Sequence, residues 1–98
     1  MTRSLEGKEL LERLLGSESK GELLMLFHKN PGLVDSVEGV ARRIGRGKDQ
    51  IEGDVRDFVE LGLFKEITAG KMTLIAFNKE RDREIQASVT QHIMGSAK

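Results

Sequence analysis

Four positively charged side chains fall within seven residues near the middle of the chain, with no acidic residue among them. They are Arg42, Arg43, Arg46 and Lys48. Guanidinium and ammonium groups concentrated in this way suit the binding of phosphate oxygens. A solvated charged surface has the same composition, so the cluster by itself leaves both interpretations open.

Other chemistry finds less support in the residue types. The run GRGK at 45–48 superficially resembles a phosphate loop, but it lacks the six-residue spacing and the preceding strand of such a loop. His28 and His92 have neither a carboxylate pair nor a cysteine nearby in sequence, which favours surface or half-buried histidines over a metal site. Serine, threonine and acidic residues never show the spacing of a nucleophile with a base and an orienting group. We therefore expect no enzyme activity, no cofactor and no metal ion.

Composition indicates one small, well-hydrated domain. The 98 residues are 38% hydrophobic and 33% charged, which is typical of a compact fold. The absence of cysteine excludes disulfides and thiolate ligands. The first residues contain no long apolar run, so we expect no signal peptide, no membrane span and a cytoplasmic protein. Sixteen basic and sixteen acidic residues cancel, whereas nucleic-acid-binding proteins often carry a positive excess.

The spacing of apolar residues and the residues typical of helix ends predict the elements that position the basic cluster. Helical periodicity predicts helices at about 5–15, from just after Ser19 to about Lys29, at 37–44, 48–61 and 79–94. The expected N-terminal caps are Ser4, Ser19 with Glu22 as a capping box, Asp35 or Ser36, and Asn78. Between the fourth and fifth helices the period becomes alternating, and two short runs flank a glycine turn at 69–71. The sequence thus predicts a mostly α domain with a β-hairpin, in the order of a winged helix.

The segment 37–63, VEGVARRIGRGKDQIEGDVRDFVELGL, resembles the helix-turn-helix of prokaryotic winged-helix repressors, which include metal-sensing and multidrug-resistance regulators. Ala41 is small where the two helices would cross, and Gly45 stands where the turn requires positive φ. Val40, Ile44 and Ile51 would fill the space between the helices. ELGLF at 60–64 and ELLMLFHKNPG at 22–32 extend the resemblance to about residues 19–77.

The resemblance implies a winged helix-turn-helix transcription regulator that binds double-stranded DNA, with 48–61 as its recognition helix. The basic cluster would contact phosphates, Gln50 and Arg56 would contact a base or a phosphate, and Lys71 would lie at the tip of the wing. Gly53, a glycine inside a helix, would allow close approach by DNA or another chain. The candidate DNA-binding residues are Arg42, Arg43, Arg46, Lys48, Gln50, Gly53, Arg56 and Lys71.

Two departures from the pattern favour another function. Arg46 stands where the motif usually has an apolar residue. The recognition helix carries two basic residues against five acidic ones, and phosphates would repel it if all of them faced DNA. Capping by Asp49 or Glu52, which have capping-box spacing, would reduce that conflict. The alternative is a winged-helix protein-interaction module whose acidic surface meets a basic partner.

The terminal helices carry apolar edges that a small core can hardly cover. Leu10, Leu11, Leu14 and Leu15 form one stripe, and the C-terminal helix has apolar residues at 85, 89 and 93. In the family such helices commonly pair two subunits, so we expect a homodimer in which residues 1–16 and 79–98 dimerise and residues 17–78 form the winged helix. Both helices could instead pack on their own domain. The histidine or cysteine clusters of metal sensors are missing, and the residues indicate no effector ligand.

Overall fold

The computed structural model describes residues 7–96, and the side chains of residues 9–91 and 93. Five helices and three strands follow one another in the order α1 (Gly7–Leu15), α2 (Glu18–Lys29), β1 (Val34–Ser36), α3 (Val37–Arg43), α4 (Lys48–Glu60), β2 (Phe64–Ala69), β3 (Met72–Phe77) and α5 (Lys79–Ser96). The helices are the predicted ones, within a few residues at each end. The Ser4 cap expected for the first helix lies outside the described residues.

The start of α2 corrects the predicted cap. Ser17, not Ser19, is the N-cap, and its hydroxyl accepts a hydrogen bond from the backbone N–H of Lys20. The capping box of Ser19 with Glu22 is therefore wrong, and both side chains turn instead toward other elements. At the other end, the predicted stop is confirmed, because α2 ends at Lys29, two residues before Pro31.

The sheet has one strand more than the predicted hairpin. β2 and β3 form an antiparallel hairpin in which Phe64 pairs with Phe77 and Ala69 with Met72. The short strand β1 adds to the other side of β3, giving the order β1-β3-β2. The sequence analysis missed β1, because three residues directly before a helix are too few to show an alternating pattern.

The core lies where the sheet meets α2, α3 and α4. Phe27, Phe58 and Phe64 are fully buried, and the ring centroid of Phe64 lies 4.7 Å from that of Phe27 and 5.2 Å from that of Phe58. Aromatic side chains contribute large apolar areas, and these tilted geometries are favourable. Ile51 and Val40 join the same core. The predicted burial of Val40 and Ile51 between the helices is thus confirmed.

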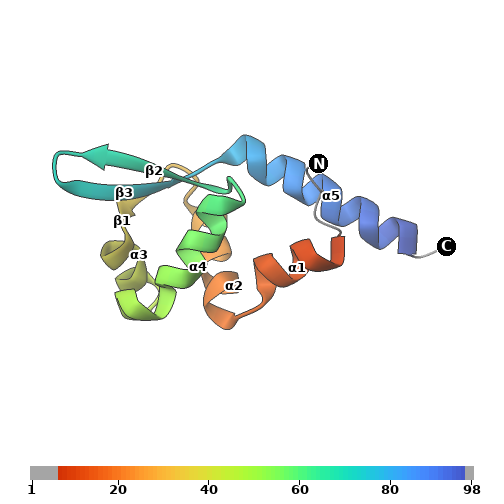
Figure 1. The fold of residues 1–98 in the computed structure, drawn as a ribbon, viewed down its shortest axis with the longest axis horizontal. Helices are drawn as coiled ribbons and strands as arrows, with labels where there is room; N and C mark the ends of the chain where they lie inside the picture. Colours follow the sequence, from red (N-terminus) through yellow and green to blue (C-terminus); the bar gives the residue numbers. More distant parts are fainter. Residues whose placement is uncertain (1–6, 97–98) are drawn as a thin grey trace.

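α1 and α5 lie side by side at the end of the molecule opposite the wing formed by β2 and β3 (Figure 1). Leu10 and Leu14 of α1 and Ile85 of α5 are buried in the core cluster. Asn78 caps α5 as predicted, because its side-chain oxygen accepts from the backbone N–H of Arg81 at 3.2 Å. The terminal helices therefore cover part of their own domain.

Candidate nucleic-acid interface

The turn between α3 and α4 has the geometry that the sequence predicted. Ser36 caps α3 by accepting from the backbone N–H of Gly39 at 3.0 Å. Gly45 has φ +71°, a left-handed conformation that side chains other than glycine rarely adopt. Ala41 is buried where the helices cross, and its carbonyl accepts from the backbone N–H of Arg46 at 2.9 Å. α4 is thereby held at a fixed angle to α3.

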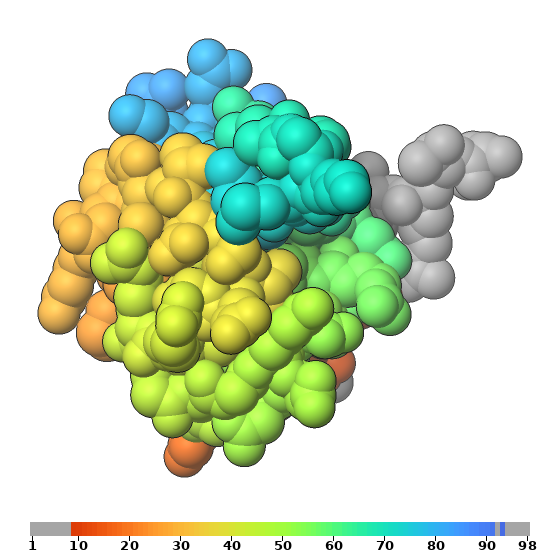
Figure 2. Space-filling model, turned by 90° about the vertical axis from the view of Figure 1, so that its left-hand side faces the viewer, coloured from red at the N-terminus to blue at the C-terminus, as the bar shows by residue number. Residues whose placement is uncertain are grey.

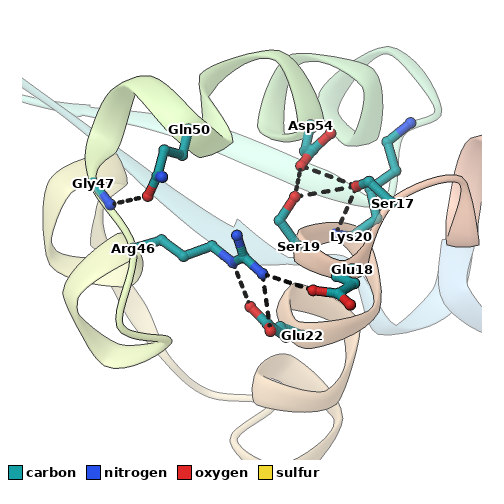
Figure 3. A network of polar contacts seen from close by, with 9 residues as sticks. All are labelled: Ser17, Glu18, Ser19, Lys20, Glu22, Arg46, Gly47, Gln50 and Asp54. Carbon is teal, nitrogen blue, oxygen red and sulfur yellow. Dashed lines mark hydrogen bonds and ion pairs between the residues drawn. The ribbon is translucent and has the colours of Figure 1, made fainter.

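Arg46 faces α2 rather than solvent. Its Nε donates to Oε1 of Glu22 at 2.6 Å, and its guanidinium also reaches Oε2 of Glu22 at 3.2 Å and Glu18 at 3.5 Å (Figure 3). The hydrogen bond from Arg46 holds the pKa of Glu22 below its ordinary 4.5. The predicted basic cluster therefore has one member occupied by acids of α2, and this pairing gives Arg46 a structural role in place of a free phosphate-binding group.

The N-terminus of α4 also differs from the prediction. Gly47 is the N-cap, and its backbone N–H donates to Oε1 of Gln50 at 2.8 Å (Figure 3). The capping box expected from Asp49 and Glu52 is wrong, since the cap Gly47 and its partner Gln50 each lie two residues earlier. Gln50 thus uses its carbonyl oxygen inside the protein, and its amide NH2 group is left for an outside partner.

Three of the five acids of α4 face α1 and α2. Asp54 accepts from the hydroxyls of Ser17 and Ser19, the former at 3.3 Å (Figure 3). Asp57 accepts from Nζ of Lys20 at 2.8 Å, which holds the pKa of Asp57 below its ordinary 3.8. Glu60 pairs with Arg13 at 3.4 Å. The contacts turn much of the negative charge of α4 toward its own chain.

The opposite side of α4 is open to solvent. Asp49, Gly53 and Arg56 follow one another at helical spacing and are all exposed, across the helix from the buried residues 51, 55 and 58. Arg56 has no hydrogen bond or ion pair among the described residues. Beside this stripe Lys48 lies 3.9 Å from Glu52, a distance at which an exposed pair contributes little. On this side of α4 the positive charges of Lys48 and Arg56 equal in number the negative charges of Asp49 and Glu52.

Further basic side chains surround the start of α4. Arg42 is exposed and unpaired within the described chain, whereas Nε of Arg43 lies 3.3 Å from Asp35. Lys71 is exposed at the tip of the wing, next to Gly70, whose φ of +63° shapes the turn. The wing, α3 and the first turns of α4 share one face of the molecule (Figure 2).

Two hollows run along this face. The first, of about 380 Å³, is lined in part by Lys48 of α4 and Lys71 of the wing. The second, of about 320 Å³, continues from Lys48 to Arg56 beneath the sheet. Lys48 lines both hollows, Lys71 lines the first and Arg56 the second, and the acids Glu38, Glu52 and Glu66 lie among the other lining residues.

A polar pair that the sequence analysis missed joins α2 to α5. Nε2 of His28 lies 3.0 Å from Oδ1 of the buried Asp82, and the His28 ring meets the edge of Phe77. The separation of 54 residues hid this carboxylate from the sequence. Within residues 7–96 no group of three or more possible metal-binding side chains occurs. The side chain of His92 lies outside the described part.

Comparison with known proteins gives one informative result. No family model matches the sequence, and no curated protein does. A crystal structure described as a possible transcriptional regulator for arsenical resistance superposes with a TM-score of 0.63, over 86% of this chain and 80% of that one, at 15% sequence identity. The fold is a winged helix. At this identity the likeness concerns the winged-helix fold.

In a winged helix, α4 occupies the place of the recognition helix. Sequence reasoning found the helix-turn-helix, because Ala41, Gly45 and the apolar spacing have local causes. It missed Glu18, Glu22 and Lys20 as partners, since they act across the helix packing. The only signal in the sequence was the placement of Glu18 and Glu22 one turn apart on one face of α2.

No helix among the described residues combines the length and the apolar character needed to cross a membrane.

Proposed function

We propose that the protein is a DNA-binding transcription regulator that inserts α4 into the major groove. The observation that carries this proposal is the sorting of charge on α4. Asp54, Asp57 and Glu60 pair with residues of α1, of α2 and of the turn between them, while Arg56 is exposed beside one of the two hollows and the wing residue Lys71 beside the other. The fold is shared with a protein described as a possible transcriptional regulator, which is consistent with this role.

Each basic residue then has a distinct role. Arg42 and Arg43 would contact backbone phosphates beside the groove, because phosphate contacts fix a protein on the duplex. The pair of Arg43 with Asp35 is exposed and weak enough to exchange for a phosphate. Lys48 and the free NH2 group of Gln50 would contact DNA at the start of α4. Lys71 would reach a phosphate or the minor groove from the wing, and Arg46 would act by fixing the turn.

The protein would act as a homodimer in the cytoplasm. Leu15 of α1 and Ile93 of α5 are exposed at 59% and 55%, although both are large and apolar. Next to Leu15 an apolar hollow of about 230 Å³ lies between α1, α2 and α5, with Val89 on its wall. Pairing two copies through this end would cover these side chains and leave both α4 helices free. Two recognition helices would suit a palindromic site.

The experiment is a fluorescence anisotropy titration of a labelled generic duplex at low and at physiological salt. We expect binding at low salt that weakens as salt rises, because phosphate contacts release counterions. Arg56→Ala and Lys71→Ala should each weaken binding several-fold. Arg83→Ala is the matched control, since Arg83 is an exposed cation of α5 that lines neither of the two hollows. Absence of binding at low salt, or equal effects of all three variants, would contradict the proposal.

A protein-interaction module is the second candidate function. It is favoured by the exposed acids Asp49 and Glu38 and by the zero net charge of the chain. On this reading α4 would meet a basic protein surface. The same titration separates the two functions, because a module of this kind would leave the anisotropy of duplex DNA unchanged at low salt.

A further inference from the structure

The exposed stripe of α4 begins with an acid in the first turn of the helix, Asp49. Asp49 has no hydrogen bond or ion pair within the part of the chain that the structure describes. Asp54 and Asp57, on the side of the helix toward α2, are held by Ser17, Ser19 and Lys20. Asp49 stands on the outermost line of the helix with Gly53 and Arg56. Any surface that docks on α4 meets these three positions first.

Gly53 has no internal reason to be glycine. It lies in the interior of α4, where glycine destabilises a helix relative to alanine. Its φ is not positive, and a Cβ built there would meet no atom within 4 Å. By contrast, a Cβ at Gly39 would displace the carboxylate of Asp35. The bare backbone at Gly53 makes the centre of the stripe the point where a partner can come closest.

An acid on a DNA-reading surface has a narrow choice of partners. Phosphates repel a carboxylate, and in the major groove the group that attracts it is the N4 amino group of cytosine. An arginine on the same surface pairs best with O6 and N7 of guanine. Asp49 and Arg56 are seven residues apart, which is about 10.5 Å along a helix at 1.5 Å per residue. That length corresponds to about three base-pair steps of 3.4 Å.

We propose that Asp49, Gly53 and Arg56 are the base-reading residues of α4. Asp49 accepts a hydrogen bond from a cytosine N4 amino group, and Arg56 donates to a guanine about three base pairs away. The backbone at Gly53 lies against the bases between them. This inference rests on the proposed DNA-binding function and adds to it the composition of the half-site. The acidity of α4 is thereby a source of specificity.

The experiment begins by selecting duplexes from a randomised pool with the wild-type protein. The selected half-site should contain a cytosine and a guanine about three base pairs apart. N4-methylcytosine at that cytosine should weaken wild-type binding about tenfold, whereas Asp49→Ala should bind both duplexes equally. Asp49→Ala should also bind generic DNA at least as tightly as the wild type, because a charge that phosphates repel is gone. Arg56→Ala should lose its preference at the guanine.

Gly53→Ala provides a second readout with a matched control. It should raise the Tm of the free protein and weaken binding to the selected duplex about tenfold or more. Gly21→Ala, at another helical glycine whose Cβ would meet nothing, should raise the Tm and leave binding unchanged. If the wild type binds no duplex, the proposed function fails together with this inference. If it binds but selects no sequence, or Asp49→Ala and Gly53→Ala behave as the wild type, only this inference is overturned.

Discussion

The guanidinium of Arg46 and the carboxylate of Glu22 lock the turn of the helix-turn-helix onto α2. Nε of Arg46 donates to Oε1 of Glu22 at 2.6 Å, across 24 residues of sequence. The side chain of Arg46 is 26% exposed, less than the other members of the basic cluster. A residue that looks suited to phosphate in the sequence thus fixes the turn before α4 to α2.

Replacing this guanidinium should act on stability. Arg46→Met removes both donors to Glu22 and leaves that carboxylate half-buried without its partner, so we expect the Tm to fall by a few degrees. Arg42→Met is the control, since Arg42 is exposed and unpaired within the described chain, and it should leave the Tm unchanged. Circular dichroism melts of both variants make the comparison. Equal Tm values for the Arg46→Met and Arg42→Met variants would contradict a structural role for Arg46.

The two carboxylates with lowered pKa predict an acid-sensitive fold. Hydrogen bonds from Arg46 and Lys20 lower the pKa of Glu22 and Asp57 in the folded protein. Below the ordinary values of 4.5 and 3.8 the unfolded chain therefore binds more protons than the folded one. The contribution of both groups is complete above those values and is lost as pH falls through the lower, folded pKa values.

Urea unfolding at several pH values checks this expectation. The wild type should lose unfolding free energy from about pH 5 downward. The double variant Glu22→Gln, Asp57→Asn should show a shallower decline, because neither group can titrate. A slope in the double variant as steep as in the wild type would contradict the assignment of these two pairs.

Gly62 should tolerate no side chain without cost. Its φ is +77°, and a Cβ there would lie 3.4 Å from the side chain of Arg81, which donates to the carbonyl of Leu61. A left-handed conformation costs a residue with a Cβ roughly 1–2 kcal/mol. We expect Gly62→Ala to lower the free energy of unfolding by about this amount in chemical denaturation, with no change in the salt dependence of DNA binding. A neutral or stabilising effect would show that the helix end relaxes freely.

The dimer proposal predicts which apolar residues matter for assembly. Leu15→Glu and Ile93→Glu should each convert a dimer into a monomer, because they place a charge in an apolar interface. Met72→Glu is the matched control, since Met72 is 56% exposed but lies on the wing. Sedimentation equilibrium at micromolar concentration measures the mass. A wild-type monomer, or a wild-type dimer that survives both changes, would refute pairing through α1 and α5.

Much of the fold could be predicted from local signals. Gly45 has the positive φ that the sequence analysis expected, and Gly62 ends α4 in the same way. The buried face of α4 follows from the spacing of Ile51, Val55 and Phe58. β1 could not be predicted, because its strand character comes from pairing with β3 and not from its own three residues.

The candidate site was less accessible to sequence reasoning, because charge pairing across helices decides it. Nothing local distinguishes Asp57, which binds Lys20, from Asp49, which binds no described residue. Likewise Arg46 and Arg42 look alike in sequence, and only the packing of α2 beside the turn separates them. The charge that α4 exposes to solvent could therefore be determined only from the three-dimensional arrangement of α1, α2 and α4.

The salt dependence of DNA affinity tests the central claim most directly. Log Kobs plotted against log salt concentration should fall with a slope of about −0.9 for each phosphate contacted. With Arg42, Arg43 and Lys71 on phosphates, each protomer should give a slope of about −2.7 or steeper. The double variant Arg42→Ala, Arg43→Ala should reduce that slope by about 1.8. A slope near zero in the wild type, or one that the double variant leaves unchanged, would contradict a DNA interface on this face.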